Sequence, residues 1–284
     1  MRVLYLRPSR TSPSYLIMRV IRYLAQDGKV RFAAEKAAGS HVDIHGDIYG
    51  DFETTDQQSN VAKILAPVEP PMILCIGHNY RKHIEETGAK MPQHPVLFLK
   101  NIGAVQNPDD PIVLPTKLRS DEVDYECELA VVIGKKCKNV SKAGAFDVVL
   151  GYTAANDVSA RDWQKRFGGG QFCRGKSFDT FAPLGPVLVT KDEIPDPNAL
   201  RIETRINGET RQSSNTADMI FDVPTLIEFL SASTTLYPGT IILSGTPSGV
   251  GMAMDPPRYL APGDVVEIDI EKIGVLRNPV VVEE

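Results

Sequence analysis

The sequence predicts a mixed α/β fold that is mainly β, with a small β-rich N-terminal domain ahead of one larger domain. The chain of 284 residues is 42% hydrophobic, which is enough to bury a large core. Short apolar runs separated by Gly, Pro, Asn and Asp fill most of it, whereas helical patterns occupy two short segments. Prolines at 67, 70 and 71 mark a stiff connector, so we expect domains at residues 1–66 and 67–284.

The N-terminal part begins with a predicted β-hairpin. Apolar and polar residues alternate over residues 20–24 and again over 30–32, on either side of Asp27 and Gly28. Such a pair of turn residues between two alternating runs is typical of a tight hairpin turn. Polar sequence rich in Gly and Asp continues from there to about Ala66.

The larger part opens with a buried strand over residues 72–76, followed by a short helix over residues 78–88. We expect Asn79 to cap the N-terminus of this helix and Gly88 to end it. Another strand is expected over residues 95–100.

Later elements follow the same reasoning. Residues 112–188 are expected to be mostly β, and residues 222–233 to form a helix with Asp222 near its start and Pro224 in its first turn. Strands are expected at residues 240–243 and 265–270, the second being the last, with a Gly-rich loop at residues 244–251.

Composition narrows the possible partners. The net charge is −5 and no basic cluster is long enough to follow a phosphate backbone, which argues against nucleic acid. The four cysteines show no CxxC spacing, which suits a reducing, intracellular compartment. No apolar run approaches the roughly 20 residues of a membrane-spanning helix. Small molecules are therefore the expected partners.

The first stretch of the chain, Met1 to Val20, is rich in Arg and Ser and contains no acidic residue. This composition is typical of a mitochondrial presequence. Pro8 and Pro13 would interrupt an amphipathic helix, so a cytoplasmic and a mitochondrial location both stay open.

Two glutamates, Glu126 and Glu128, stand where an apolar run over residues 129–133 begins. Alternate side chains of a strand share a face, so two like charges would enter a core together, which is unfavourable. Asp157, after a second apolar strand over residues 148–155, adds a third carboxylate. A Glu-x-Glu pair is most often a solvated face. Here three oxygen donors predict a Mg²⁺ site, with Mn²⁺ or Ca²⁺ as alternatives.

His83 and Glu86 are three residues apart on the predicted helix and therefore share a face. The carboxylate could orient or activate the imidazole for proton transfer. Such pairs usually lie on the solvent-exposed surface of a helix and have no catalytic role, but this one directly follows a buried strand.

Lys176 lies in a stretch, residues 170–177, that matches the letters of a phosphate-binding loop, GxxxxGK[ST]. No buried strand precedes the stretch, and Pro183 follows too soon for a long helix, so nucleotide binding is not expected. Lys176 remains a cation that could face a developing oxyanion.

Other polar residues are expected near the same site. Thr246, in the Gly-rich loop, offers a hydroxyl and a backbone N–H to a carboxylate, or is simply part of a turn. Arg161, Trp163 and Gln164 follow Asp157 closely and could line the same cavity, although Trp163 could only pack.

Six of these segments, in this order from about Pro71 to the C-terminus, resemble the fumarylacetoacetate hydrolase family, and most closely one eukaryotic group of that family with its microbial relatives. Any single segment is weak evidence, whereas six in the family's order are specific. The segments are Gly77 to Glu86, Pro95 to Lys100, Glu126 to Glu128, Asn156 to Gln164, Gly175 to Asp179 and Ser244 to Gly251.

The resemblance implies a β-roll fold, usually in a homodimer, with Mg²⁺ or Mn²⁺ at Glu126, Glu128 and Asp157. It also implies that His83 and Glu86 form a catalytic dyad on a lid helix. Lys176, Gln164 and Thr246 would face the substrate. The Gly-rich stretch from Lys165 to Gln171 is longer than in many relatives, so the substrate stays open.

The family's substrates are small 1,3-dicarbonyl or 2-oxo acids that react through a metal-bound enolate. We expect an acylpyruvate-type hydrolase of C–C bonds, with oxaloacetate keto–enol tautomerase or decarboxylase as the alternative. A non-catalytic homologue that only binds metal or ligand is the rival from another class, and His83, Glu86 and Lys176 argue against it.

Overall fold

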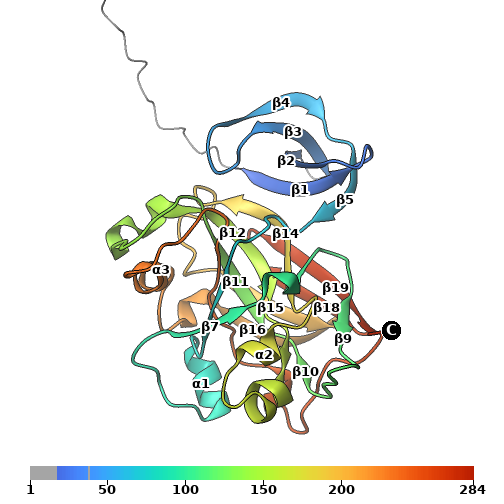
Figure 1. Cartoon of the computed structure of the whole chain (residues 1–284), viewed down its shortest axis with the longest axis vertical. Coiled ribbons are helices and arrows are strands. Elements are labelled where there is room, and N and C mark those ends of the chain that lie inside the picture. The colour runs from blue at the N-terminus through green and yellow to red at the C-terminus, as the bar shows by residue number, and fades with distance from the viewer. Residues whose placement is uncertain (1–17, 38) are drawn as a thin grey trace, which may run out of the picture.

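The computed structural model describes residues 18–37 and 39–284 and is built mainly of β-strands (Figure 1). Residues 1–17, which carry most of the Arg- and Ser-rich stretch, lie outside the described residues. The mainly β class is confirmed. The division between residues 66 and 67 stays a prediction.

The N-terminal strands form a compact group at one end of the molecule (Figure 1). Val20 pairs with Ala34 and Leu24 with Val30, which confirms the predicted hairpin. Gly28, with φ of 78°, supplies the left-handed conformation that its turn requires. The strands are β1 (Arg19–Ala25), β2 (Val30–Ala37), β3 (Ser40–Gly46), β4 (Phe52–Gln58) and β5 (Val61–Leu65).

A large sheet runs through the molecule in the order β4-β3-β2-β1-β14-β12-β11-β17-β6-β7. Strands β11 and β12 are buried along their whole length, which explains why most of their residues are apolar and do not alternate with polar ones. These two strands form the centre of the hydrophobic core. The strands beyond β1 are β6 (Ile73–Gly77), β7 (Val96–Lys100), β11 (Cys127–Ile133), β12 (Val149–Asn156), β14 (Ala182–Thr190) and β17 (Ile241–Leu243).

A second sheet has the order β16-β15-β18-β19-β9. The prediction that β18 is the last strand was wrong, because β19 follows and pairs with it. Pro279, inside β19, argues against a strand in the sequence, and it lies at the last pair that β19 forms with β18, opposite Val265. The strands are β9 (Ile112–Leu114), β15 (Arg201–Ile206), β16 (Glu209–Asn215), β18 (Val265–Ile270) and β19 (Gly274–Val282).

The helices are short. The prediction for the first helix was wrong at its start, because α1 begins at Arg81 with Tyr80 as its N-cap, not Asn79. Gly88 ends α1 in the left-handed region, as predicted. The α-helices are α1 (Arg81–Thr87), α2 (Cys173–Lys176) and α3 (Val223–Ser231), and Asp222 caps α3.

The remaining elements are brief. Helix α2 has only four residues, so the stretch around Lys176 does not form a phosphate-binding loop. None of the helices in the described residues is long and apolar enough to cross a bilayer. The brief elements are β8 (Val105–Gln106), β10 (Val123–Asp124), β13 (Ser159–Ala160), the 3₁₀ turns η1 (Ile102–Ala104), η2 (Lys142–Val148), η4 (Thr216–Asp218) and η5 (Gly251–Ala253), and the π-helix η3 (Trp163–Phe167).

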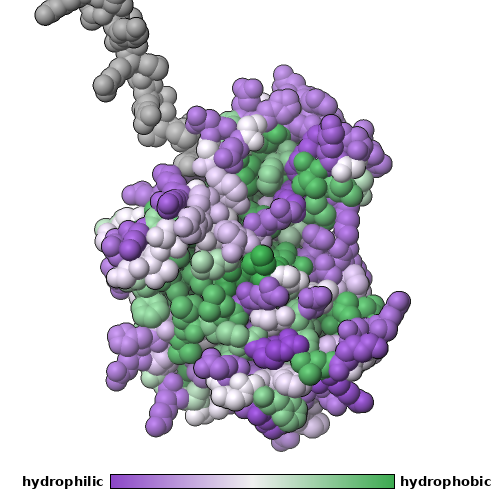
Figure 2. Space-filling view, viewed as in Figure 1, coloured by the Kyte–Doolittle hydropathy of each residue, from purple (hydrophilic) through white to green (hydrophobic). Residues whose placement is uncertain are grey.

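Strand β7 is an edge of the large sheet. Its residues Leu97 and Leu99 are each 45% exposed, and Figure 2 shows apolar side chains gathered in the region where Figure 1 places this strand. The homodimer implied by the resemblance stays a prediction.

Candidate metal and catalytic site

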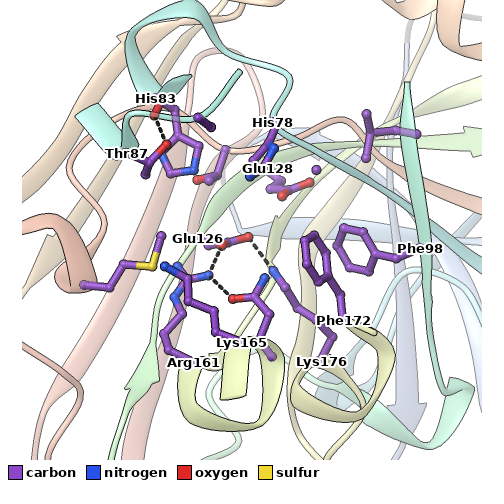
Figure 3. Close-up of a pocket in the computed structure, with 16 residues that line it drawn as sticks. His78, His83, Thr87, Phe98, Glu126, Glu128, Arg161, Lys165, Phe172 and Lys176 are labelled. Carbon is purple, nitrogen blue, oxygen red and sulfur yellow. Dashed lines mark hydrogen bonds and ion pairs between the residues drawn. The ribbon is translucent and has the colours of Figure 1, made fainter. Parts of the chain in front are cut away.

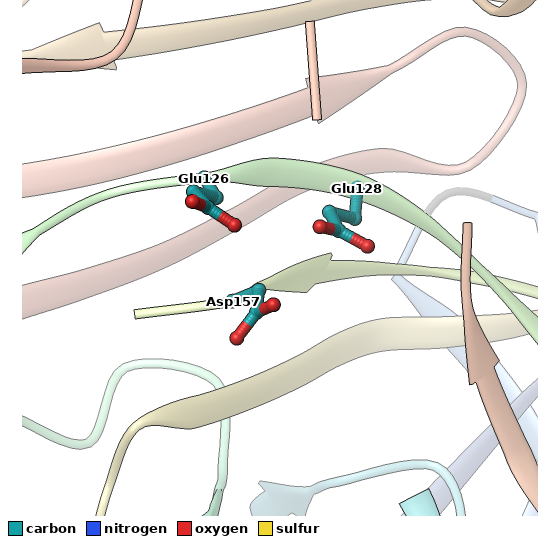
Figure 4. Close-up of side chains that lie close together, drawn as sticks. All are labelled: Glu126, Glu128 and Asp157. Atoms are coloured by element: carbon teal, nitrogen blue, oxygen red, sulfur yellow. The ribbon is translucent and has the colours of Figure 1, made fainter. Parts of the chain in front are cut away.

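Glu126, Glu128 and Asp157 lie together where β11 and β12 meet. The strands are antiparallel and Glu128 pairs with Ala155, so the start of β11 lies beside the end of β12. The three side chains are buried, and one ligand oxygen from each lies within 4.8 Å of the others. Figure 4 shows the three carboxylates close together. The structure thus brings together the residues that the sequence predicted as metal ligands.

Hydrogen bonds hold this cluster in place. Asn156 Oδ1 accepts the N–H of Glu126 at 3.0 Å, and the Glu126 carbonyl accepts the N–H of Asp157 at 2.9 Å. Glu128 Oε2 accepts the N–H of Gly245 at 2.7 Å. The Gly-rich loop is therefore bonded directly to the cluster.

Three cationic side chains surround the carboxylates. Lys176 Nζ donates to Glu126 Oε2 at 2.7 Å and to Asp157 Oδ2 at 2.9 Å. Arg161 Nη1 donates to Glu126 Oε1 at 2.6 Å. Lys100 Nζ donates to Asp157 Oδ1 at 2.5 Å. Since all of these groups are buried, their interactions are poorly screened.

The three-carboxylate cluster is electrostatically uneven. Burial disfavours the charge on Glu126, but Lys176 and Arg161 outweigh burial and hold the pKa of Glu126 well below its ordinary value. For Glu128, burial together with the carboxylates of Asp157 and Glu126 raises the pKa well above its ordinary value. Within the described part of the chain, Glu128 forms no ion pair.

The site fits a hard divalent cation. Its predicted ligands are all oxygen donors, which Mg²⁺, Mn²⁺ and Ca²⁺ prefer. Four buried carboxylates face three cationic side chains, so negative charge is in excess, and Glu128 is the carboxylate that no described cation pairs with. The four carboxylates belong to Asp124, Glu126, Glu128 and Asp157, and the cations to Lys100, Arg161 and Lys176.

Lys100 and Asp124 belong to the site but are absent from the prediction. Alternation along β7 places Lys100 on the same buried face as Phe98, which is the sequence signal for an inward-facing lysine. Asp124 precedes Glu126 by two positions and is fully buried. Its Oδ2 accepts Arg161 Nε at 2.9 Å and so fixes that guanidinium.

The predicted pair on α1 is formed. His83 Nδ1 lies 3.1 Å from Glu86 Oε2, and Glu86 Oε1 accepts the N–H of Gly249 at 2.7 Å. The His83 side chain is 6% exposed, whereas that of Glu86 is 21% exposed. Glu86 is thus held by the Gly-rich loop, and it in turn orients the imidazole.

A cavity of about 260 Å³ joins these groups (Figure 3). Asp157 and Glu86 do not line it, but each is bonded to a residue that does, Asp157 to Lys176 and Glu86 to His83. The other seven predicted site residues line the cavity: His83, Glu126, Glu128, Arg161, Gln164, Lys176 and Thr246.

The remaining predicted residues differ in their contacts. Gln164 Oε1 accepts Arg161 Nη1 at 3.0 Å, and Thr246 Oγ1 accepts Gln212 Nε2 at 2.9 Å. Trp163 is not part of the lining, and its indole N–H donates to a backbone carbonyl elsewhere. Among the lining residues that sequence reasoning missed are His78, Lys165 and Phe172.

Comparison with known proteins identifies the family of the chain. Residues 72–281 match the protein family described as "Fumarylacetoacetate (FAA) hydrolase C-terminal". The chain therefore belongs to the fumarylacetoacetate hydrolase family and is an enzyme of that family.

Relatives and solved structures narrow the comparison. The chain is 49% identical over 225 residues to "Oxaloacetate tautomerase fahd2, mitochondrial" of Xenopus laevis, covering 79% of this chain and 70% of the relative. It is 50% identical over 218 residues to the Homo sapiens "Oxaloacetate tautomerase FAHD2A, mitochondrial", covering 76% and 69%. The crystal structure of 2-hydroxyhepta-2,4-diene-1,7-dioate isomerase from Mycobacterium marinum superposes with a TM-score of 0.81 at 41% identity, covering 94% of this chain and 99% of that chain. The predicted resemblance, including its eukaryotic group, is confirmed.

Proposed function

We propose that this chain is a keto–enol tautomerase of oxaloacetate that depends on a divalent cation, with Mg²⁺ as the expected metal. The observation that supports this most is that His83 and the carboxylates of Glu126 and Glu128 line one cavity. The names of the relatives support tautomerisation over the C–C hydrolysis that was expected from the family resemblance.

Glu126, Glu128 and Asp157 would hold the cation, which, when bound, would polarise the carbonyl of the oxo acid. Lys176 contributes a fixed positive charge beside this position. Burial lowers its pKa, but Asp157 and Glu126 outweigh burial and raise the pKa, so the ammonium stays charged. Lys176 can therefore donate a hydrogen bond to an oxygen that gains negative charge.

Tautomerisation moves one proton between C3 and the carbonyl oxygen, and no bond between carbon atoms breaks. When Nδ1 of His83 donates to Glu86, its Nε2 is free to accept the proton from C3. The Glu86 carboxylate stabilises the imidazolium that results. The imidazolium then returns a proton to the oxygen, which completes the enol and restores His83.

Arg161 is suited to hold a substrate carboxylate. The residue is 2% exposed and lines the cavity, and its Nη2 is a buried donor without a partner among the described residues. A buried donor without a partner is costly, and an incoming carboxylate would remove that cost. Asp124 and Glu126 keep the guanidinium in place.

Hydrolysis of an acylpyruvate is the second candidate. The specific observation that favours it is the His83–Glu86 pair, which could also deprotonate a water molecule. The same cavity would then have to accommodate that water next to the substrate carbonyl.

One experiment separates the candidates. Purified protein with Mg²⁺ is incubated with enol-oxaloacetate and with acetylpyruvate, and loss of enol absorbance is followed together with release of pyruvate and acetate. Loss of enol-oxaloacetate without pyruvate supports the tautomerase, whereas pyruvate from oxaloacetate identifies a decarboxylase. Pyruvate and acetate from acetylpyruvate identify the hydrolase. Turnover of neither compound would refute the proposed enzyme.

Location and assembly are part of the proposal. The mitochondrial names of the relatives favour the mitochondrial alternative for this chain. A homodimer is proposed from the family resemblance. Import of a full-length fluorescent fusion and light scattering of the purified protein test these two points.

A further inference from the structure

Two polar side chains of the cavity, His78 and Lys165, have no part in the steps above. Both line the cavity, and they come from different segments, the turn between β6 and α1 and the π-helix η3. Among the described residues, neither His78 nor Lys165 has a side-chain hydrogen bond or an ion pair. Both are therefore available to a ligand.

His78 is held in the cavity against its backbone preference. Its φ of 55° lies in the left-handed region, which residues other than Gly adopt at a cost in free energy. The next residue, Asn79, is fully buried and fixes the turn: its amide donates to Phe221 O and Ser244 O at 3.0 and 2.7 Å, and its Oδ1 accepts Phe221 N–H at 2.8 Å. The surrounding structure thus imposes the conformation that turns His78 towards the cavity.

The surroundings of His78 leave its imidazole neutral at pH 7. Its ring lies edge-on to Phe172 at 6.4 Å and at 6.5 Å from the ring of His83. Burial, followed by the neighbouring His83, lowers the pKa of His78. A neutral imidazole presents one N–H donor and one acceptor.

Lys165 is the one cationic side chain of the cavity lining that forms no ion pair with a described residue. The other two cationic side chains of the lining, Arg161 and Lys176, both pair with carboxylates of the cluster. Lys165 stands at the rim, where it is exposed, and no described carboxylate pairs with it. Its positive charge therefore attracts an anion into the cavity.

We infer that Lys165 and His78 bind the second carboxylate of a dicarboxylate substrate, the one that is not part of the 2-oxo acid group, and so select dicarboxylates over monocarboxylates. The inference rests on the proposed function. The proposed reaction places the 2-oxo acid group of the substrate next to the carboxylate cluster and Lys176. The other carboxylate must therefore bind elsewhere in the cavity. Lys165 supplies charge at the rim, and His78 supplies an oriented N–H from the opposite segment.

Binding of non-reacting ligands tests this inference without turnover. Malate and 2-hydroxybutanoate differ in having a carboxylate or a methyl group at the distal end. We expect the wild-type chain with Mg²⁺ to bind malate at least tenfold more tightly in calorimetric titration. Lys165→Met should weaken malate binding about tenfold, because the charge is lost, and leave 2-hydroxybutanoate binding unchanged.

Further variants distinguish a direct contact with the ligand from an effect of the substitution on the structure. Lys165→Arg keeps the charge and should retain most of the malate preference. His78→Gly removes the ring at a position where glycine is unstrained, and should weaken malate binding about threefold, whereas His78→Asn keeps a polar group and should recover part of it. Lys138→Met changes an exposed lysine outside the cavity and serves as the matched control.

Equal losses for the two ligands in Lys165→Met, or no loss of malate binding, would overturn the inference. Wild-type protein that binds the two ligands equally would also overturn it. These outcomes are independent of catalysis. If the protein fails to tautomerise oxaloacetate but still prefers malate through Lys165, the proposed reaction is wrong and the dicarboxylate site stands.

Discussion

Two ion-pair networks in this molecule use the same residue types in different surroundings. In the buried network beside β11 and β12, the side chains of the paired residues are at most 7% exposed. In the network on β15 and β18, they are 17% to 48% exposed. The buried network comprises Lys100, Asp124, Glu126, Asp157, Arg161 and Lys176; the outer network comprises Arg201, Glu203, Arg205, Glu267 and Asp269.

The comparison teaches that burial, rather than the number of ion pairs, identifies the functional network. Exposed pairs are screened by water and contribute little to stability. Buried pairs carry a desolvation cost that their attraction barely offsets. Apolar residues in the same positions would therefore often give the fold equal stability. A chain that keeps charged groups in its core, next to a cavity, is therefore expected to use them chemically.

The largest effect is expected from Lys176→Met in the buried network. Loss of this ammonium removes the positive charge that faces the developing oxyanion, and tautomerase activity should fall on the order of 10³-fold. Steady-state kinetics measure this loss, with Lys138→Met as the control. Activity within a few-fold of the wild type would mean that Lys176 is only structural.

Lys100→Met is expected to act mainly on stability. Lys100 is fully buried and bonds Asp157 Oδ1 from outside the cavity, so its loss leaves part of a buried negative charge uncompensated. In denaturant titrations without divalent cations, the free energy of unfolding should be lower than that of the wild type by about 3 kcal/mol. A stability equal to that of the wild type would contradict the role assigned to Lys100.

The raised pKa of Glu128 predicts a pH-dependent stability. Because the folded state holds this proton more tightly than the unfolded chain, stability from Glu128 is present below the ordinary carboxyl pKa of 4.5 and is lost as pH rises towards the raised value. In EDTA, the melting temperature of Glu128→Gln minus that of the wild type should therefore increase as pH rises above 4.5. A difference that does not change with pH would contradict the raised pKa.

The smallest effect is expected in the outer network. Arg201, with a side chain that is 48% exposed, pairs with Asp269 at 3.3 Å. Arg201→Ala should change the free energy of unfolding by less than about 1 kcal/mol and leave activity unchanged. An effect as large as that of Lys100→Met would remove the distinction between the two networks.

Much of the fold could be predicted because local patterns agree with it. The turn at Asp27 and Gly28 and the cap at Asp222 depend on neighbours a few residues away. Asn79 was misassigned because its side chain bonds Phe221 and Ser244, which are distant in sequence. Strand β19 was missed because it is specified by its pairing with β18 and β9.

In the candidate site, too, some residues could be predicted from the local sequence and others could not. Glu126, Glu128 and Asp157 could be predicted because their charges stand at the ends of apolar runs. Lys100 ends such a strand too, but only the paired structure shows that its ammonium meets Asp157, 57 residues away. His78 and Lys165 carry no local signal, because their importance comes from the cavity that they share.

The central claim is that the three-carboxylate cluster binds a divalent cation, and Glu128→Gln tests it most directly. This variant removes the carboxylate that lacks a cationic partner while keeping its shape. Calorimetric titration of Mg²⁺ should show binding to the wild type and at least a tenfold weaker affinity in Glu128→Gln, in a protein that melts no lower than the wild type in EDTA at pH 8. An unchanged Mg²⁺ affinity in the folded variant would contradict the account.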